Sequence, residues 1–163
     1  MIIFEESEEE KLCVPADDGT THINTYSKGK TELGRMLSNF YYSPFEHQDF
    51  GKFHSVEGFW YWYITGQQHD SLRDMYGYSA KKAGKEFIKQ YCIEYDEKFY
   101  DIVLECITLK IFSNPDIISE MKSSTLPFVH YYYYGDNNPK VHIIECKWMM
   151  DGLEVIRQFL KEE

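Results

Sequence analysis

The chain lacks the short motifs that mark metal, redox and nucleoside-triphosphate sites. Its four cysteines are far apart and form no C-x-x-C pair, so their spacing excludes zinc and thioredoxin-type sites. No phosphate-binding loop, dinucleotide fingerprint or nucleophile elbow is present, and no histidine has a partner at metal-ligand spacing. We therefore predict no bound metal and no cofactor, and we interpret the histidines, His130 among them, as structural or solvated.

Positive charge is also scarce, with 17 Lys and Arg against 27 Asp and Glu and a formal net charge of −10. Proteins that bind long nucleic acids normally carry a basic surface, because phosphate contacts supply most of the affinity. The acidic excess argues against long duplex nucleic acid as a partner, whereas a small nucleotide needs only a few local cations. The acidic start, MIIFEESEEE, does not fit a signal peptide, and free thiols suit a reducing compartment, so we expect a cytoplasmic protein without a membrane partner.

What the chain does contain is enough apolar sequence for one folded domain. It has 163 residues, of which 43% are hydrophobic and 17% aromatic, with 14 Tyr and 11 Phe. No repeat, low-complexity linker or domain boundary interrupts it. We predict a compact α+β domain, mainly helical with a few short strands, over residues 23–163. An acidic segment over residues 1–22 precedes it, with short strands expected at 1–4 and 12–14.

Periodicity and capping residues predict most elements of this domain. Helices are expected over 55–64, 70–76, 79–91, 96–112, 116–123 and 149–161, and strands over 22–26, 128–134 and 141–146. Residues 27–32 are expected to form a loop, and residues 37–57 to form loops and short strands around two turns. The apolar run at 59–64 fits either a strand or a buried helix, and we favour the helix because Ser55 is a good N-cap.

Residues 37–66 carry the strongest functional signal. Glu57 opens a run of five aromatic residues at positions 59–63 that no charge interrupts. A carboxylate leading into so apolar a run is expected to be partly desolvated, and desolvated acids commonly serve in catalysis or ligand binding. The alternative is that Glu57 is an ordinary acid in the first turn of a helix, stabilised by the helix dipole.

Lysines form the second candidate set. Lys81, Lys82 and Lys85 lie close together on the helix expected at 79–91, either as a solvated face or as a local cationic patch for a diphosphate. Lys110 lies near the end of the helix expected at 96–112, among apolar neighbours. Desolvation lowers the pKa of a lysine, and a neutral amine can act as a nucleophile. Alternatively, Lys110 extends to solvent and favourably meets the C-terminal helix dipole.

Several segments, taken in order, resemble the NADAR/YbiA-like family. They are LSNFYYSPF followed by GKFHSVEGFW, AKKAGKEF at 80–87, Tyr95-Asp96, LKIF at 109–112, Tyr134-Gly135-Asp136 and IRQFL at 156–160. The similarity extends over residues 23–160. The chain departs from the family pattern at Gly58 and Ile64, where the family has His and Lys. It also has Tyr131 and its neighbours where the family often has an acidic residue, and Tyr in place of Trp at 95 and 134.

This resemblance implies a mostly α fold that binds ADP-ribose-like or other ribosyl nucleotides and cleaves an N-glycosidic bond, for example between ADP-ribose and guanine. Glu57 would be the essential acid, and Lys110 would attack the anomeric carbon. The substrate-binding residues it implies are Ser38, Asn39, Phe40, Lys82, Gly84, Tyr95, Tyr134, Gly135 and Asp136. The chemistry is consistent, because breaking such a bond builds positive charge on the ribose, which a nearby carboxylate stabilises.

Two other functions remain open from the sequence. The departures from the family pattern fit a weak or inactive enzyme that only binds ADP-ribose or another NAD-derived nucleotide. A third function is a protein-interaction module, in which the tyrosine-rich surface and the acidic run at 5–10 bind a basic partner. That module predicts a salt-sensitive complex and no nucleotide binding.

Overall fold

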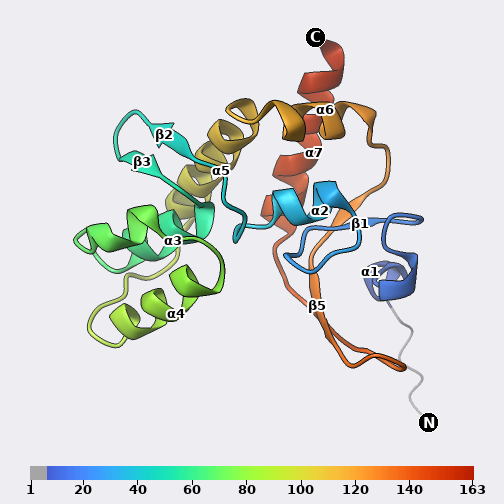
Figure 1. The fold of residues 1–163 in the computed structure, drawn as a ribbon, viewed down its shortest axis with the longest axis horizontal. Helices are drawn as coiled ribbons and strands as arrows, with labels where there is room; N and C mark the ends of the chain where they lie inside the picture. Colours follow the sequence, from blue (N-terminus) through green and yellow to red (C-terminus); the bar gives the residue numbers. More distant parts are fainter. Residues whose placement is uncertain (1–6) are drawn as a thin grey trace.

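The computed structural model describes residues 7–163, which form an α+β fold that is mainly helical, as predicted (Figure 1). The helices are α1 (Glu8–Leu12), α2 (Glu32–Leu37), α3 (Val56–Ile64), α4 (Gly77–Ile88), α5 (Glu97–Phe112), α6 (Pro115–Ser123) and α7 (Lys147–Glu162), with short 3-10 helices η1 (Pro15–Asp17) and η2 (Asp70–Asp74). The strands are β1 (Ile23–Asn24), β2 (Phe45–His47), β3 (Gly51–Phe53), β4 (Phe128–Val129), β5 (Tyr131–Tyr134) and β6 (Lys140–Ile143).

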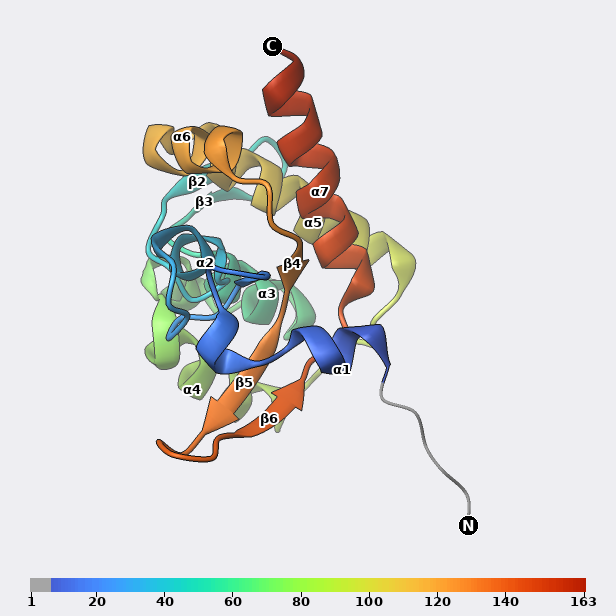
Figure 2. The same ribbon diagram turned by 90° about the vertical axis from the view of Figure 1, so that its right-hand side faces the viewer.

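The strands make small two-stranded pairings. β2–β3 and β5–β6 are antiparallel hairpins, whereas β1 pairs in parallel with β4, which is distant in the sequence. Figure 1 shows α3, α4 and the β2–β3 hairpin on one side and α1, β1 and the β5–β6 hairpin on the other. Figure 2 shows α6 and α7 at one end and the β5–β6 hairpin projecting at the opposite end.

The core is organised around α5, which packs against β2, α3, α6 and α7. Apolar side chains recur every three or four positions along this helix, at Phe99, Ile102, Val103, Cys106 and Ile107, and they are buried, as is Ile111 in its last turn. Asp96 caps the helix by accepting a hydrogen bond from the Phe99 backbone N–H at 2.8 Å. Burial of each such side chain stabilises the fold by roughly 1.5–3 kcal/mol, which makes α5 the main support of the elements around it.

The start of α3 confirms the helix predicted from Ser55. The Ser55 hydroxyl accepts a hydrogen bond from the Gly58 N–H at 3.0 Å and donates one to the Met75 carbonyl at 2.8 Å. A Cβ atom at Gly58 would lie 2.4 Å from the carbonyl oxygen of Leu72, so no side chain fits there. The close packing of η2 on the first turn of α3 therefore requires glycine at position 58, where the pattern that the sequence resembles has His.

The structure corrects several predicted elements. Residues 27–31 form a loop as expected, but α2 begins at Glu32, the last residue of that predicted loop, and covers 33–36, to which nothing was assigned. The Thr31 hydroxyl caps α2 by accepting from the Gly34 N–H at 2.9 Å. The helix expected at 70–76 is a short 3-10 helix, and α4 begins at Gly77 rather than at Ser79. The strand expected at 128–134 is divided at His130 into β4 and β5.

The N-terminal segment is helical rather than extended at its described end. The strand predicted at 12–14 is wrong, because Ser7 and Glu10 form a capping box that starts α1 and Cys13 ends it. The strand predicted at 1–4 lies outside the described residues. Asp18 is buried and accepts hydrogen bonds from the backbone N–H groups of Asn24 at 3.1 Å and Lys30 at 2.8 Å, which fastens residues 7–22 to the rest of the fold.

Candidate active site

A cleft with two lobes lies between the loop after α2, the helix α3 and the β5 strand. Its small lobe has a volume of 70 Å³ and its larger, aromatic lobe 380 Å³, which is within the usual range for small-molecule sites. Both lobes are lined by Asn39, Glu57, His130, Tyr132 and Met149, which form the junction between them. These junction residues come from four separate parts of the chain, brought together by the parallel pairing of β1 with β4 and by the packing of α7.

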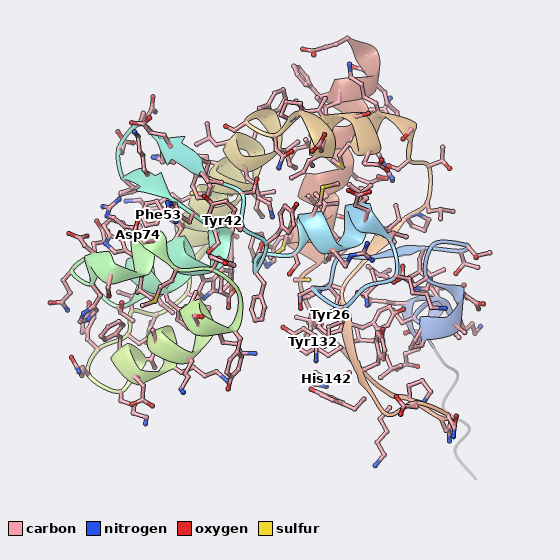
Figure 3. All side chains as sticks on the ribbon, in the orientation of Figure 1. Tyr26, Tyr42, Phe53, Asp74, Tyr132 and His142 are labelled. Carbon is pink, nitrogen blue, oxygen red and sulfur yellow. The ribbon has the colours of Figure 1, made fainter. Side chains whose placement is uncertain are left out.

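The other lining residues give the two lobes different chemistry. The small lobe is completed by Thr25, Tyr26, Ser27, Leu37, Ser38 and Phe40. The aromatic lobe is completed by Trp60, Tyr61, Lys81, Tyr95, Tyr100, Ile144, Glu145, Cys146 and Trp148. Figure 3 shows Tyr26 and Tyr132 close together beneath α2 and beside β5, and their ring centroids are 5.1 Å apart. The small lobe thus combines the hydroxyl groups of Thr25, Ser27 and Ser38 with the rings of Tyr26 and Phe40, whereas the larger lobe carries more aromatic rings.

The Ser38-Asn39-Phe40 loop is held by three neighbouring helices. The Asn39 carbonyl accepts a hydrogen bond from the Glu57 N–H of α3 at 2.9 Å, and the Phe40 carbonyl accepts one from the Gly77 N–H of α4 at 2.8 Å. The Ser38 carbonyl accepts one from the Lys110 amine of α5 at 2.8 Å. These backbone contacts fix the loop, so the Asn39 side chain is held at the junction without a large entropy cost on ligand binding.

Glu57 stands in the first turn of α3 with its side chain at the junction. Desolvation raises the pKa of its carboxyl from 4.5 to about 7, although the nearby Lys81 and Lys85 act in the opposite direction. The carboxyl is therefore close to half protonated at neutral pH. The prediction that the acid leading into the aromatic run is desolvated is confirmed. Glu57 also lies in the first turn of α3, as the alternative interpretation expects, so its position is compatible with both.

Lys81 is the lysine of α4 that reaches the aromatic lobe. Its Nζ lies 5.9 Å from the ring centroid of Phe40 and 5.6 Å from that of Tyr132, within the range of a cation–π contact. Lys82, the residue implied by the family resemblance, is exposed on another face of the helix and does not line either lobe. Successive helical residues differ by about 100° in direction, which separates these two neighbours.

Lys110 is buried, but it lies against the loop and does not line either lobe. Its side chain is 1% exposed, and its amine has Ser38 as a backbone acceptor and the Tyr41 ring 5.8 Å away. Burial lowers its pKa from 10.5 to about 7, so a large fraction of the amine is neutral at physiological pH. The sequence alternative in which Lys110 extends to solvent is wrong.

The remaining residues implied by the resemblance fall into two groups. Tyr95 lines the aromatic lobe, and its hydroxyl accepts a hydrogen bond from Trp60 Nε1 at 3.4 Å. Gly84 packs against the Tyr61 ring, and a Cβ atom at this position would lie 2.0 Å from Tyr61 Cγ. Gly84 therefore makes room for the Tyr61 ring, which lines the aromatic lobe, but Gly84 does not line the lobe itself. Tyr134 is the exposed last residue of β5, and Gly135 and Asp136 begin the exposed turn of the β5–β6 hairpin; all three lie outside the lining of both lobes.

His130 is the main site residue that the sequence reasoning missed. Burial lowers the pKa of its imidazole from 6.5 to about 4, against a smaller opposing effect of the Thr25 backbone, so the ring is neutral at physiological pH. The signal was present in the alternation of FVHYYYY, because residues 130 and 132 of an extended segment face the same side. Tyr132 belongs to the junction for the same reason.

No protein-family model matches the chain, and no curated protein sequence matches it. The resemblance to the NADAR/YbiA-like family therefore stays a prediction based on motifs and their order. Within residues 7–163, no group of three or more His, Cys, Asp or Glu side chains is placed to hold a metal ion. No helix in that same range has the length and apolar character needed to cross a membrane.

Proposed function

We propose that the chain is an N-glycosidase-type hydrolase that acts on an ADP-ribose-like or other ribosylated nucleotide, with the two-lobed cleft as its active site. The observation that carries the proposal is Glu57, a carboxyl at the junction of the lobes with a pKa raised to about 7. Such a group can donate and accept a proton near neutral pH, as general acid–base catalysis requires.

In the proposed reaction, the bond between the anomeric carbon and the base nitrogen breaks, and its electron pair leaves with the base. Glu57 donates its proton to that nitrogen, and the resulting carboxylate stabilises the positive charge that develops on the ribose. Water then adds to the anomeric carbon, and Glu57 takes up a proton from it. The products are the free base and the ribosyl hydroxyl compound, and the carboxyl is restored.

The lining of the cleft fits the parts of such a substrate. Aromatic rings bind a planar base by stacking, and the aromatic lobe contributes Trp60, Tyr95 and Trp148 among others. Lys81, with the exposed Lys85 one turn further along α4, supplies local positive charge for a diphosphate in an otherwise acidic chain. This local patch accounts for how a protein with net charge −10 holds an anionic nucleotide.

Lys110 has two possible roles in this reaction, as a nucleophile or as a positioning residue. As a nucleophile, its neutral amine attacks the anomeric carbon, the base leaves, the sugar ring opens to a Schiff base, and water hydrolyses that intermediate. This role requires the amine to leave the Ser38 carbonyl, 2.8 Å away, and enter the cleft. As a positioning residue, the amine instead holds the loop that presents Asn39. Borohydride reduction during turnover separates the two, because only a Schiff base is trapped covalently.

A second candidate function is binding without turnover. The position of Lys110 favours it, because the amine lies outside the lining of both lobes. A binding protein keeps the junction and the stacking surface but needs no nucleophile.

The test is to mix the purified chain with ADP-ribose, NAD and ADP-ribosylated guanosine, and to measure binding by calorimetry and released base by chromatography. Base release supports the glycosidase. Binding of these nucleotides without release supports the second candidate, and no binding of any of them contradicts both. The acidic interaction module is then tested by the salt dependence of complexes formed with basic proteins.

A further inference from the structure

Two buried polar atoms at the junction have no hydrogen-bond partner among residues 7–163. They are Asn39 Oδ1 and His130 Nδ1. In folded proteins the large majority of buried polar atoms are paired, because an unpaired one has lost its water without any compensation. Two such atoms lining the same cleft are therefore positions where the polar groups of a bound ligand would find partners.

Both side chains are held in position before any ligand arrives. Asn39 Nδ2 makes a weak contact with Met149 Sδ at 4.0 Å, and its backbone is tied to Glu57. The His130 ring meets the Tyr132 ring edge-on with centroids 5.3 Å apart, and its backbone carbonyl accepts from the Ile144 N–H at 3.0 Å. The pair thus behaves as a fixed, preorganised recognition element.

The chemistry of the two atoms selects the ligand group. Asn39 Oδ1 only accepts hydrogen bonds, whereas the nitrogen of a neutral imidazole either donates or accepts according to its tautomer. A phosphate offers mainly acceptors at neutral pH, so it leaves Asn39 Oδ1 unpaired. A hydroxyl both donates and accepts, so a pair of hydroxyls satisfies both atoms. A base edge also carries donors, but the larger set of rings that can stack on its face, Trp60, Tyr95 and Trp148 among them, lines the aromatic lobe.

We propose that Asn39 and His130 bind the vicinal hydroxyls of the ribosyl group, with the sugar edge directed into the small lobe and the base in the aromatic lobe. This inference rests on the proposed function and deepens it. It places Glu57 beside the bond between sugar and base, since Glu57 lines both lobes. It also makes His130 a specificity-determining residue that selects ribosyl over deoxyribosyl ligands.

The test compares the affinities of ADP-ribose and of its two analogues that lack the 2- or the 3-hydroxyl on the terminal ribose. Calorimetry is carried out on the wild type and on His130→Leu, which keeps the volume and removes the ring nitrogens. His142→Leu is the matched control, because His142 is an exposed histidine of β6 that does not line either lobe (Figure 3). Asn39→Ala removes the other acceptor and serves if His130→Leu fails to fold.

We expect the wild type to bind ADP-ribose about tenfold more tightly than at least one deoxy analogue, which corresponds to one lost hydrogen bond. The ratio of the two affinities should fall to about one in His130→Leu and in Asn39→Ala, and it should stay at the wild-type value in His142→Leu. A preference that persists in either cleft variant, or is absent from a wild type that binds ADP-ribose, overturns this inference and leaves the proposed function standing. No binding of ADP-ribose and no base release from any of the three nucleotides overturns both.

Discussion

The Lys110 amine donates a hydrogen bond to the Ser38 carbonyl oxygen at 2.8 Å, from a side chain that is only 1% exposed. This contact joins the end of α5 to the loop that presents Asn39 to the cleft. No carboxylate forms an ion pair with this amine within residues 7–163, so burial is uncompensated by a counter-charge and lowers its pKa to about 7. The stability of the fold is therefore linked to the protonation of one buried lysine.

Stability should rise with pH above 7 because of Lys110. In the unfolded chain this lysine keeps its proton up to about pH 10.5, whereas in the folded protein it loses it near pH 7. The unfolded state thus binds more protons between these values, and raising the pH favours the folded state. We expect the wild type to gain about 1–2 kcal/mol over Lys110→Met between pH 7 and pH 9, measured by urea denaturation. Parallel curves for the two proteins would show that Lys110 keeps its ordinary pKa.

Glu57 should have the opposite linkage. Its carboxyl holds its proton in the folded protein up to about pH 7, but loses it near pH 4.5 in the unfolded chain. Between these values the folded state binds more protons, so the stability that this group contributes is lost as the pH rises. At pH 8 the free energy of unfolding of Glu57→Gln should therefore exceed that of the wild type by about 1–2 kcal/mol, with a higher melting temperature. This difference in free energy should shrink at pH 5. An equal difference at both pH values would contradict the raised pKa.

The neighbouring lysines of α4 provide a matched pair. Lys81 lines the aromatic lobe and lies over the Phe40 and Tyr132 rings, whereas Lys82 is exposed on another face. Lys81→Ala should weaken the binding of ADP-ribose about fivefold, and Lys82→Ala should change it little, because a charge on the surface is screened. An equal loss in both variants would mean that only the total charge of the helix matters.

A side chain at position 58 should harm the fold, and histidine, the residue of the pattern that the sequence resembles, tests this. A Cβ atom there would lie 2.4 Å from the Leu72 carbonyl oxygen and 3.1 Å from that of Met75, and both are backbone atoms. We expect Gly58→His to destabilise the protein by about 1–3 kcal/mol through overpacking between α3 and η2. Thermal unfolding beside Ser119→Ala, at an exposed site of α6, is the check, and a stability equal to that of the wild type would contradict the close packing.

Local patterns predicted the long elements, whereas contacts between distant segments determined the rest. α5 was predictable because apolar residues recur every three or four positions after the Asp96 cap. α3 was predictable because Ser55 is a good N-cap residue in front of a long apolar run. α2 was missed because it is short and its apolar face has only Leu33, Met36 and Leu37. A six-residue helix is stable only through its packing, which a local pattern does not reveal.

The site was predictable only in part for the same reason. Glu57 could be found because its aromatic neighbours follow it directly in the sequence. His130 reaches the same junction from a distant segment, through the pairing of β1 with β4. Each of these strands has only two residues, so their pairing could not be predicted from the sequence. The resemblance pointed to Lys82, but the helical phase of α4 brings Lys81 to the cleft instead.

The most direct test of the proposed activity is the rate of base release by Glu57→Gln at saturating ADP-ribosylated guanosine. Glu120→Gln is the matched control, because Glu120 is an exposed acid of α6 that lines neither lobe. We predict that Glu57→Gln still binds the substrate but releases base about 10²–10⁴-fold more slowly, while Glu120→Gln stays near the wild-type rate. A Glu57→Gln enzyme that releases base at the wild-type rate would contradict the assignment of Glu57 as the catalytic acid.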